Sequence, residues 1–288
     1  MRNLAFVFVV LMVSCQSDER NDYLHSVAEN DINLSKPKRG EWLYEHKEKG
    51  QSFGQFAKSK PIVPTNARNI IYLKPIGTFT ELQRRQIALV KNYLELFFQL
   101  KVRVADGISD DIVPENARRI GGENNEQLLA GYVLDSVLIR AKPDDAIVMM
   151  GLSALDLYPK DDWNYVFGLA SYRDKVGVSS IYRLQDSKLT DANFNLCLTR
   201  LVKICSHEIG HMFGLRHCID ADCMMNGTNN LDETDEHTTR LCSHCQRKLN
   251  YTLKYDNRKR LAGLIDYFKK QGMTKEYAVL QKDWEEIE

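Results

Sequence analysis

Three histidines, a glutamate and a glycine stand in a spacing that restricts this chain more than any other feature of its sequence. The stretch HEIGHMFGLRH begins at His207 and places His211 four residues later. Side chains four apart lie one above the other on a helix, so both imidazoles can face one point while Glu208 is offset beside it. Two imidazoles with a neighbouring carboxylate suit a Zn²⁺ site. Gly214 can adopt the positive φ that ends a helix and redirects the chain, which makes His217 the candidate third ligand.

The three-histidine pattern predicts a catalytic rather than a structural metal site. Three protein ligands leave the fourth zinc position open to water. Zinc lowers the pKa of such a water to about 7, and Glu208 can accept its proton and return it to a leaving amine. The chemistry implied is hydrolysis of a peptide or amide bond. We expect the histidines at His25, His46, His237 and His244 to be surface or packing residues.

Four cysteines follow the last histidine of the motif in two close pairs, Cys218 with Cys223 and Cys242 with Cys245. Two close pairs with a spacer predict a zinc site of four thiolates, since each pair supplies two sulfurs from one tight turn. Two disulfides remain the alternative in an exported protein, and His244 in place of one thiolate is a further alternative. Cys197 and Cys205 stand eight residues apart on a predicted helix, about 12 Å, which exceeds the reach of a disulfide. We expect both to be buried apolar residues.

Short apolar runs that alternate with helical periodicity predict an α/β fold. The predicted strands cover residues 69–73, 102–104, 144–151, 166–170 and 176–184. Thr80, followed three residues later by Gln83, forms a capping box that predicts a helix to about Leu100. A second helix, from Thr190 to about residue 214, carries the histidines. The segment 246–288 is expected to form two helices broken at Gly272.

The first fifteen residues resemble a bacterial lipoprotein signal. An apolar run, LAFVFVVLMV, lies near the start of the chain and is too short to span a bilayer as a helix, which needs about 20 residues. It ends close to Cys15, and the ending resembles the lipobox in which the cysteine becomes the lipidated first residue. We expect residues 1–15 to be a signal peptide, 16–36 a flexible linker and 37–288 one catalytic domain. The protein is then exported to a bacterial cell envelope, for example the outer membrane, where the lipid on Cys15 anchors it without spanning the membrane. An N-terminal core strand is the alternative interpretation of the apolar run.

At the histidine and cysteine motifs the sequence resembles the archaemetzincin family. The shared pattern is the metzincin helix, a cysteine directly after the third histidine, Cys-x-Met and Cys-x-x-Cys. The resemblance implies a metzincin-like zincin domain with a mixed sheet, an active-site helix and C-terminal helices from about residue 246. It also implies two zinc ions and a general base, namely a catalytic zinc on His207, His211 and His217 beside Glu208, and a structural zinc on Cys218, Cys223, Cys242 and Cys245.

The same resemblance implies two further features of the site. Met225, in the stretch CMMNG, matches the family's Met-turn beneath the zinc ligands, although the spacing also allows the adjacent Met224 or a core role for either residue. Residues 176–184 correspond to the edge strand of the cleft, to which an extended peptide or protein substrate can add by main-chain hydrogen bonds. The resemblance covers roughly residues 40–250.

The net charge of the chain and the presence of Glu208 distinguish between the candidate functions. The chain carries 39 basic and 39 acidic residues, so its formal charge is zero and no nucleic-acid footprint is visible. The leading interpretation is a zinc-dependent metallopeptidase that acts as a monomer on peptide substrates. The alternative is a catalytically silent zinc-binding surface lipoprotein. Both functions use every metal ligand, but only the enzyme gives Glu208 a role, which favours the enzyme.

Overall fold

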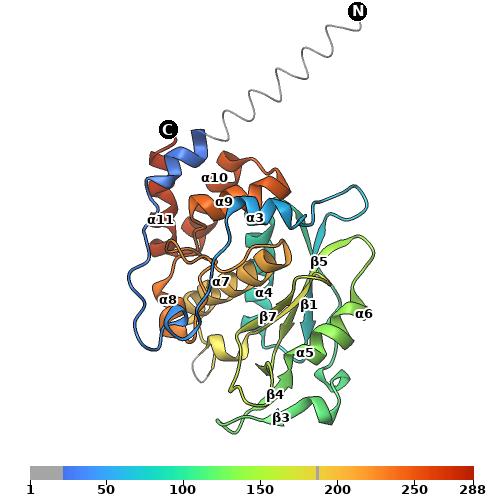
Figure 1. Cartoon of the computed structure of the whole chain (residues 1–288). Coiled ribbons are helices and arrows are strands. Elements are labelled where there is room, and N and C mark those ends of the chain that lie inside the picture. The colour runs from blue at the N-terminus through green and yellow to red at the C-terminus, as the bar shows by residue number, and fades with distance from the viewer. Residues whose placement is uncertain (1–21, 186–187) are drawn as a thin grey trace, which may run out of the picture.

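The computed structural model describes residues 22–185 and 188–288, and its centre is a five-stranded sheet (Figure 1). The strands are β1 (Ile70–Ile76), β2 (Lys101–Val104), β5 (Ala146–Ser153), β7 (Gly168–Ser171) and β8 (Val176–Ser180). Their order across the sheet is β2-β1-β5-β8-β7. β7 runs antiparallel to β8 and the other neighbours are parallel. The predicted α/β fold with a mixed sheet is confirmed.

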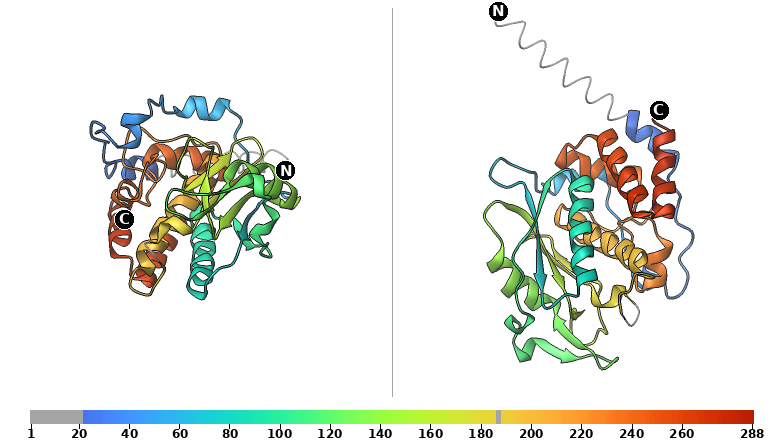
Figure 2. Two further views of the ribbon diagram at one scale, coloured as in Figure 1. Left: turned by 90° about the horizontal axis from the view of Figure 1, so that it is seen from below. Right: turned by 180° about the vertical axis from the view of Figure 1, so that it is seen from behind.

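Helices cover both faces of this sheet (Figures 1 and 2). Side chains alternate along a strand, so neighbouring residues of β1 enter different cores. Ile71 and Leu73 join a large core with α4 (Glu81–Phe98) and α7 (Phe194–Met212). Ile70 and Tyr72 join a smaller core with one helical stretch on the other face. That stretch consists of α5 (Ala130–Tyr132), the π-helical η3 (Val133–Leu138) and α6 (Ile139–Ala141).

Local sequence signals account for the start of α4 and the end of α7, whereas α7 begins at Phe194 and not at the predicted Thr190. Thr80 Oγ1 accepts a hydrogen bond from Gln83 N at 3.3 Å, and Gln83 Oε1 accepts one from Thr80 N at 2.9 Å. The predicted capping box therefore starts α4. α7 ends at Met212, and Gly214 follows with a φ of +97°, the left-handed turn that the motif requires.

A second, three-stranded sheet was not predicted. It consists of β3 (Arg118–Ile120), β4 (Glu126–Leu129) and β6 (Asp156–Tyr158) in that order. Its strands are short and partly polar, so they carry no strong periodicity. The fully buried Asp156 carboxylate holds the sheet together because it accepts hydrogen bonds from Asn125 Nδ2 (2.8 Å), Gln127 Nε2 (2.6 Å) and Arg183 Nε (2.9 Å).

The C-terminal region holds three helices where the sequence predicted two. They are α9 (Ser243–Leu253), α10 (Asn257–Gln271) and α11 (Thr274–Glu285). α9 ends at Lys254, which has a φ of +52°, and Asp256 caps α10 by accepting a hydrogen bond from Lys259 N at 2.9 Å. The break between α9 and α10 contains no glycine, so the sequence does not predict it. The predicted break at Gly272 is present, with a φ of +69°.

The expected flexible linker, residues 16–36, differs from the structure over its described part. Residues 22–28 are helical, and Tyr23 and Val27, four apart on one helix face, are buried against the C-terminal helices. Asp31 accepts hydrogen bonds from Ser243 N at 3.1 Å and from Arg240 Nη1 at 2.6 Å. Long-range polar contacts and two apolar side chains hold this segment. Neither produces a repeating apolar pattern, and the linker prediction rested on the absence of such a pattern.

The remaining helices are short and lie between the larger elements. They are α2 (Trp42–Glu45), α3 (Phe53–Lys58), η1 (Asp110–Ile112), η2 (Glu115–Ala117), η4 (Tyr182–Leu184) and α8 (Leu231–Glu236). Among the residues that the structure describes, no helix has both the length and the apolar character to cross a membrane. The predicted signal peptide and its Cys15 lie outside the described residues.

Candidate metal centre and active-site cleft

The structure brings the three predicted histidines together. His207 and His211 lie on the last turns of α7, and His217 returns to them after the turn at Gly214. One ring nitrogen from each lies within 4.8 Å of the others. The rings of His207 and His211 are 4.4 Å apart, and the ring of His217 lies 5.1 and 4.9 Å from them.

Hydrogen bonds at the outer ring nitrogens fix which nitrogens face one another. Each Nδ1 faces an oxygen acceptor: Met224 O for His207 at 3.0 Å, Leu215 O for His211 at 2.7 Å and Glu48 Oε1 for His217 at 2.8 Å. Each Nδ1 therefore carries the proton, and the three Nε2 lone pairs remain for a metal. Burial, with a smaller effect of the neighbouring His217, lowers the pKa of His211 to about 3. Neutral imidazoles with three free Nε2 atoms are the donor set that zinc requires, so these residues fit the metal.

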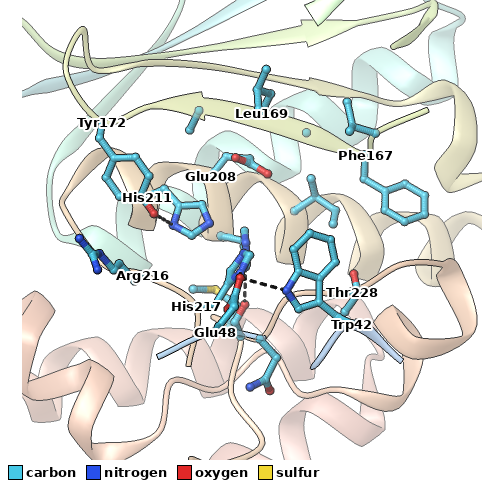
Figure 3. A pocket seen from close by; sticks show the side chains of 18 of the residues that line it. Trp42, Glu48, Phe167, Leu169, Tyr172, Glu208, His211, Arg216, His217 and Thr228 are labelled. Carbon is cyan, nitrogen blue, oxygen red and sulfur yellow. Dashed lines mark hydrogen bonds and ion pairs between the residues drawn. The ribbon is translucent and has the colours of Figure 1, made fainter. Parts of the chain in front are cut away.

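Glu208 lies beside the histidines and makes no hydrogen bond to any described residue (Figure 3). It is 7% exposed, and burial raises its pKa to about 8. Its side chain packs against Gly168 on β7, where an added Cβ would lie 2.6 Å from Glu208 Oε1. Position 168 must therefore be glycine for Glu208 to keep this place, and the carboxylate stays free to exchange protons in the cleft.

The two adjacent methionines occupy different places. Met225 is fully buried, and its sulfur would lie 2.7 Å from a Cβ added at Gly210, between the two histidines of α7. Met224 lines the cleft and supplies the carbonyl that accepts the hydrogen bond from His207. The residue beneath the histidine helix is thus Met225, the one that the family pattern pointed to.

The four predicted cysteines also converge. Their sulfurs lie within 4.8 Å of one another, and all four side chains are buried. Cys218 Sγ and Cys242 Sγ are 3.7 Å apart, far beyond the 2.05 Å of a disulfide, and none of these four cysteines forms a disulfide. Hydrogen bonds from Cys223 and from the other two cysteines of the cluster lower the pKa of Cys218. Cys223 Sγ also accepts a hydrogen bond from Cys242 N at 3.3 Å. Four converging thiols with a stabilised thiolate fit a tetrahedral zinc.

The other candidates of the sequence lie outside both clusters. His244 is exposed and does not join the four cysteines. Cys197 and Cys205 are buried separately, and burial raises the pKa of Cys205, as suits apolar packing residues.

A cleft of about 1060 Å³ runs across the histidine cluster, between β7 and the loops that follow α7 (Figure 3). Its upper wall contains Phe167 and β7, the edge strand of the sheet. The sequence interpretation placed the edge strand at residues 176–184, which is wrong. β8 is fully buried and pairs with β5 on one side and β7 on the other, so it is an interior strand.

Three residues that sequence reasoning missed complete the site. Glu48 Oε1 accepts hydrogen bonds from His217 Nδ1 and, at 3.2 Å, from Trp42 Nε1. Burial alone would raise the pKa of Glu48, but the hydrogen bond and charge of His217 lower it. Tyr172, at the other end of the cleft, places its hydroxyl 2.7 Å from His211 Nδ1. All three are brought in by chain folding from segments without a motif, so no local signal marks them.

Comparisons with known proteins agree with this geometry. Residues 129–251 match the model of peptidase family M54. The chain is 32% identical over 260 residues to archaemetzincin-2 of Rattus norvegicus, covering 80% of this chain and 72% of the relative. It is 30% identical over 184 residues to an archaemetzincin of Thermococcus kodakarensis, covering 62% of this chain and 95% of the relative.

Solved structures show the same likeness. The crystal structure of archaemetzincin from Methanopyrus kandleri superimposes with a TM-score of 0.54 at 28% identity, covering 67% of this chain and all of that one. An archaemetzincin from Archaeoglobus fulgidus gives a TM-score of 0.50 at 26% identity, covering 62% of this chain and 99% of that one. With fold, clustered histidines and relatives in agreement, this chain belongs to the archaemetzincins, the zinc metallopeptidases of family M54.

Proposed function

We propose that His207, His211 and His217 hold a catalytic zinc through their Nε2 atoms and that Glu208 moves the proton during peptide-bond hydrolysis. Zinc held in this way is a Lewis acid that lowers the pKa of a water ligand to about 7 and polarises the scissile carbonyl. Glu208 accepts the proton of the attacking water and returns it to the leaving amine. Its position on α7 against Gly168 of β7, without a hydrogen-bond partner among the described residues, supports this role.

The observation that carries the proposal is that the Nδ1 atom of each of the three histidines is hydrogen-bonded to an oxygen. Each histidine has its outer nitrogen hydrogen-bonded to an oxygen acceptor, so the three inner nitrogens can point to one common centre. A cluster of histidines with only a packing role has no reason to align in this way. The direct test loads the purified protein with zinc and digests a broad peptide library with and without a chelator. Cleavage that the chelator abolishes supports the proposal, and no cleavage by the zinc-loaded protein contradicts it.

Substrate binding along β7 follows from its position. As the edge strand it offers unpaired backbone groups to the cleft, and an extended peptide can add to them as a further strand. A peptide bound in this way would have its scissile bond over the three histidines and beside Glu208.

We also propose that Cys218, Cys223, Cys242 and Cys245 hold a second, structural zinc. These residues join the loop after the third histidine to the first turn of α9, so the metal would fix the floor of the cleft against the C-terminal helices. The silent zinc-binding lipoprotein receives no support, since it leaves the placement of Glu208 against Gly168 without a use.

Glu48 is a positioning residue for His217 in this proposal. Glu48→Gln keeps the size of the side chain but removes the negative charge that orients the imidazole of His217, so zinc affinity should fall about 10–100-fold. Competition with a chromophoric chelator measures this affinity without any substrate. Glu45→Gln is the matched control, because Glu45 lies exposed on the same segment and accepts only the backbone hydrogen bond from Gly40 N. Equal zinc affinity in both variants would remove Glu48 from the site.

For the N-terminus we propose an export signal ending at Cys15, lipidation of that cysteine and anchoring in a bacterial cell envelope. The expected mature chain begins at Cys15 and partitions with membranes, which mass spectrometry of the N-terminal peptide and cell fractionation measure. Cys15→Ala should release the protein from the membrane fraction. Membrane association of Cys15→Ala, or processing at another residue, would leave simple secretion as the better account.

A further inference from the structure

The cleft is far more basic than the chain as a whole. The chain carries equal numbers of basic and acidic residues, 39 of each. The charged residues that line the cleft are Lys47, Lys49, Lys60, Lys160, Lys175, Lys203 and Arg216 against Glu48 and Glu208. Seven cations thus face two carboxylates, and both carboxylates belong to the zinc site described above.

Two of these cations are already paired. Lys203 is buried and donates hydrogen bonds from Nζ to Thr234 O at 3.0 Å and to His237 O. Lys160 forms an ion pair with Asp162 at 3.0 Å. The other five form no ion pair with any residue that the structure describes. Their charges are open to a ligand in the cleft.

Four of the five are carried by segments that contact the loop Gly214–Arg216 at one end of the cleft. Gln51 Nε2 donates to Gly214 O at 3.0 Å, which brings the neighbouring Lys49 to this loop. A Cβ added at Gly214 would lie 3.3 Å from Pro61 Cβ, which places Lys60 there as well. We name the group Lys49, Lys60, Lys175 and Arg216 the basic end.

The turn between β7 and β8 supplies the last member of the basic end. Tyr172 Oη donates to Leu215 O at 3.2 Å, so this turn, which also carries Lys175, contacts the same loop. Tyr172 and Arg216 lie together at one end of the cleft, away from Phe167 and Trp42 (Figure 3). Burial lowers the pKa of Lys175, and no carboxylate acts on it in the opposite sense. A bound carboxylate would supply that missing partner.

We propose that the basic end selects acidic peptides, so that Asp and Glu side chains near the scissile bond determine which substrates the cleft accepts. The inference rests on the proposed peptidase function, because β7 and the zinc site make a peptide the expected occupant. A cleft lined by one sign of charge concentrates ligands of the opposite sign and raises their association rates by about 10–10³-fold, with a strong dependence on salt. No cation of the basic end touches the zinc ligands through an ion pair, so selection and catalysis can be separated by mutation.

The experiment uses pairs of fluorogenic peptides that differ only by Glu or Gln at positions flanking the scissile bond. We expect the zinc-loaded wild type to cleave the Glu peptide with a kcat/KM about tenfold higher at low salt, and this ratio to approach one as NaCl increases. The quadruple variant K49Q/K60Q/K175Q/R216Q should lose the ratio. R216Q alone should reduce it, which keeps the test valid if the quadruple variant folds poorly.

The control variant is K254Q/K259Q/K269Q/K282Q, which removes the same charge from exposed positions on and between the C-terminal helices, none of which lines the cleft. It should keep the wild-type ratio. Equal cleavage of both peptides by the wild type, or an equal loss of the ratio in the control, overturns the inference.

A measurement of peptide binding tests this inference independently of the proposed function. Zinc-loaded Glu208→Gln should bind a labelled Glu peptide more tightly than its Gln counterpart in fluorescence anisotropy. If the wild type cleaves neither peptide, the proposed function fails, while tighter binding of the Glu peptide still supports acidic selection. A single-stranded oligonucleotide that displaces the Glu peptide at lower concentration than unlabelled peptide does would contradict a peptide ligand.

Discussion

Glu208→Gln should bind zinc as the wild type does and hydrolyse peptides about 10²–10⁴-fold more slowly, the usual weight of general acid–base catalysis. The amide has the size of the carboxylate and fits the same space beside Gly168, so folding is unaffected. It cannot accept the proton of the attacking water. The measurements are kcat/KM on one fluorogenic peptide and metal content by atomic emission.

His211→Ala is the contrasting variant. It removes one imidazole of three, and a site with two protein ligands binds zinc weakly, so metal and activity should be lost together. Retained metal with lost activity in Glu208→Gln, against loss of both in His211→Ala, separates proton transfer from metal binding. If Glu208→Gln cleaves as fast as the wild type, Glu208 is not the base.

Removing one thiolate should produce the largest loss of stability. Structural zinc contributes about 10 kcal/mol or more to folding in small zinc-binding peptides. At about 2–4 °C per kcal/mol for a chain of this size, Cys223→Ala should lower Tm by more than about 20 °C or prevent folding. Cys205→Ala is the control, since Cys205 is equally buried but lies outside the cluster, and its Tm should change little. Thermal unfolding followed by circular dichroism measures both.

The zinc content of the wild type should be measured together with these variants. We expect two zinc ions per chain, with the ion at the histidines lost first under mild chelation, because an open coordination position exchanges more readily than a closed one. One ion per chain, with disulfides among the four cysteines by mass spectrometry, would contradict the structural zinc.

The features that local spacing controls could be predicted from the sequence. His207 and His211 converge because four residues complete about one helical turn, and Gly214 was expected to turn because glycine adopts positive φ at low cost. Thr80 and Gln83 cap α4 through contacts three residues apart. In each case the interaction lies within one turn of chain, where the sequence itself fixes the distance.

The features that depend on distant contacts could not be predicted. Glu48 stands between two lysines in a segment without periodicity, and nothing in that segment points to His217. Asp156 organises a second sheet from Asn125, Gln127 and Arg183, which are polar residues that sequence patterns assign to the surface. The edge strand was misplaced because strand order is set by the fold and not by the order of strands in the sequence.

The Glu48–His217 hydrogen bond has a consequence for how the enzyme matures. It joins residues 169 positions apart, and the Asp31 contact with Ser243 spans 212. Synthesis proceeds from the N-terminus, and contacts of such long sequence separation form late in folding. The N-terminal segment therefore cannot form these contacts until α7 and the residues that follow it have been synthesised. A nascent or partly folded chain lacks the Glu48 contact that orients His217, so we expect full activity only when nearly the whole molecule has assembled.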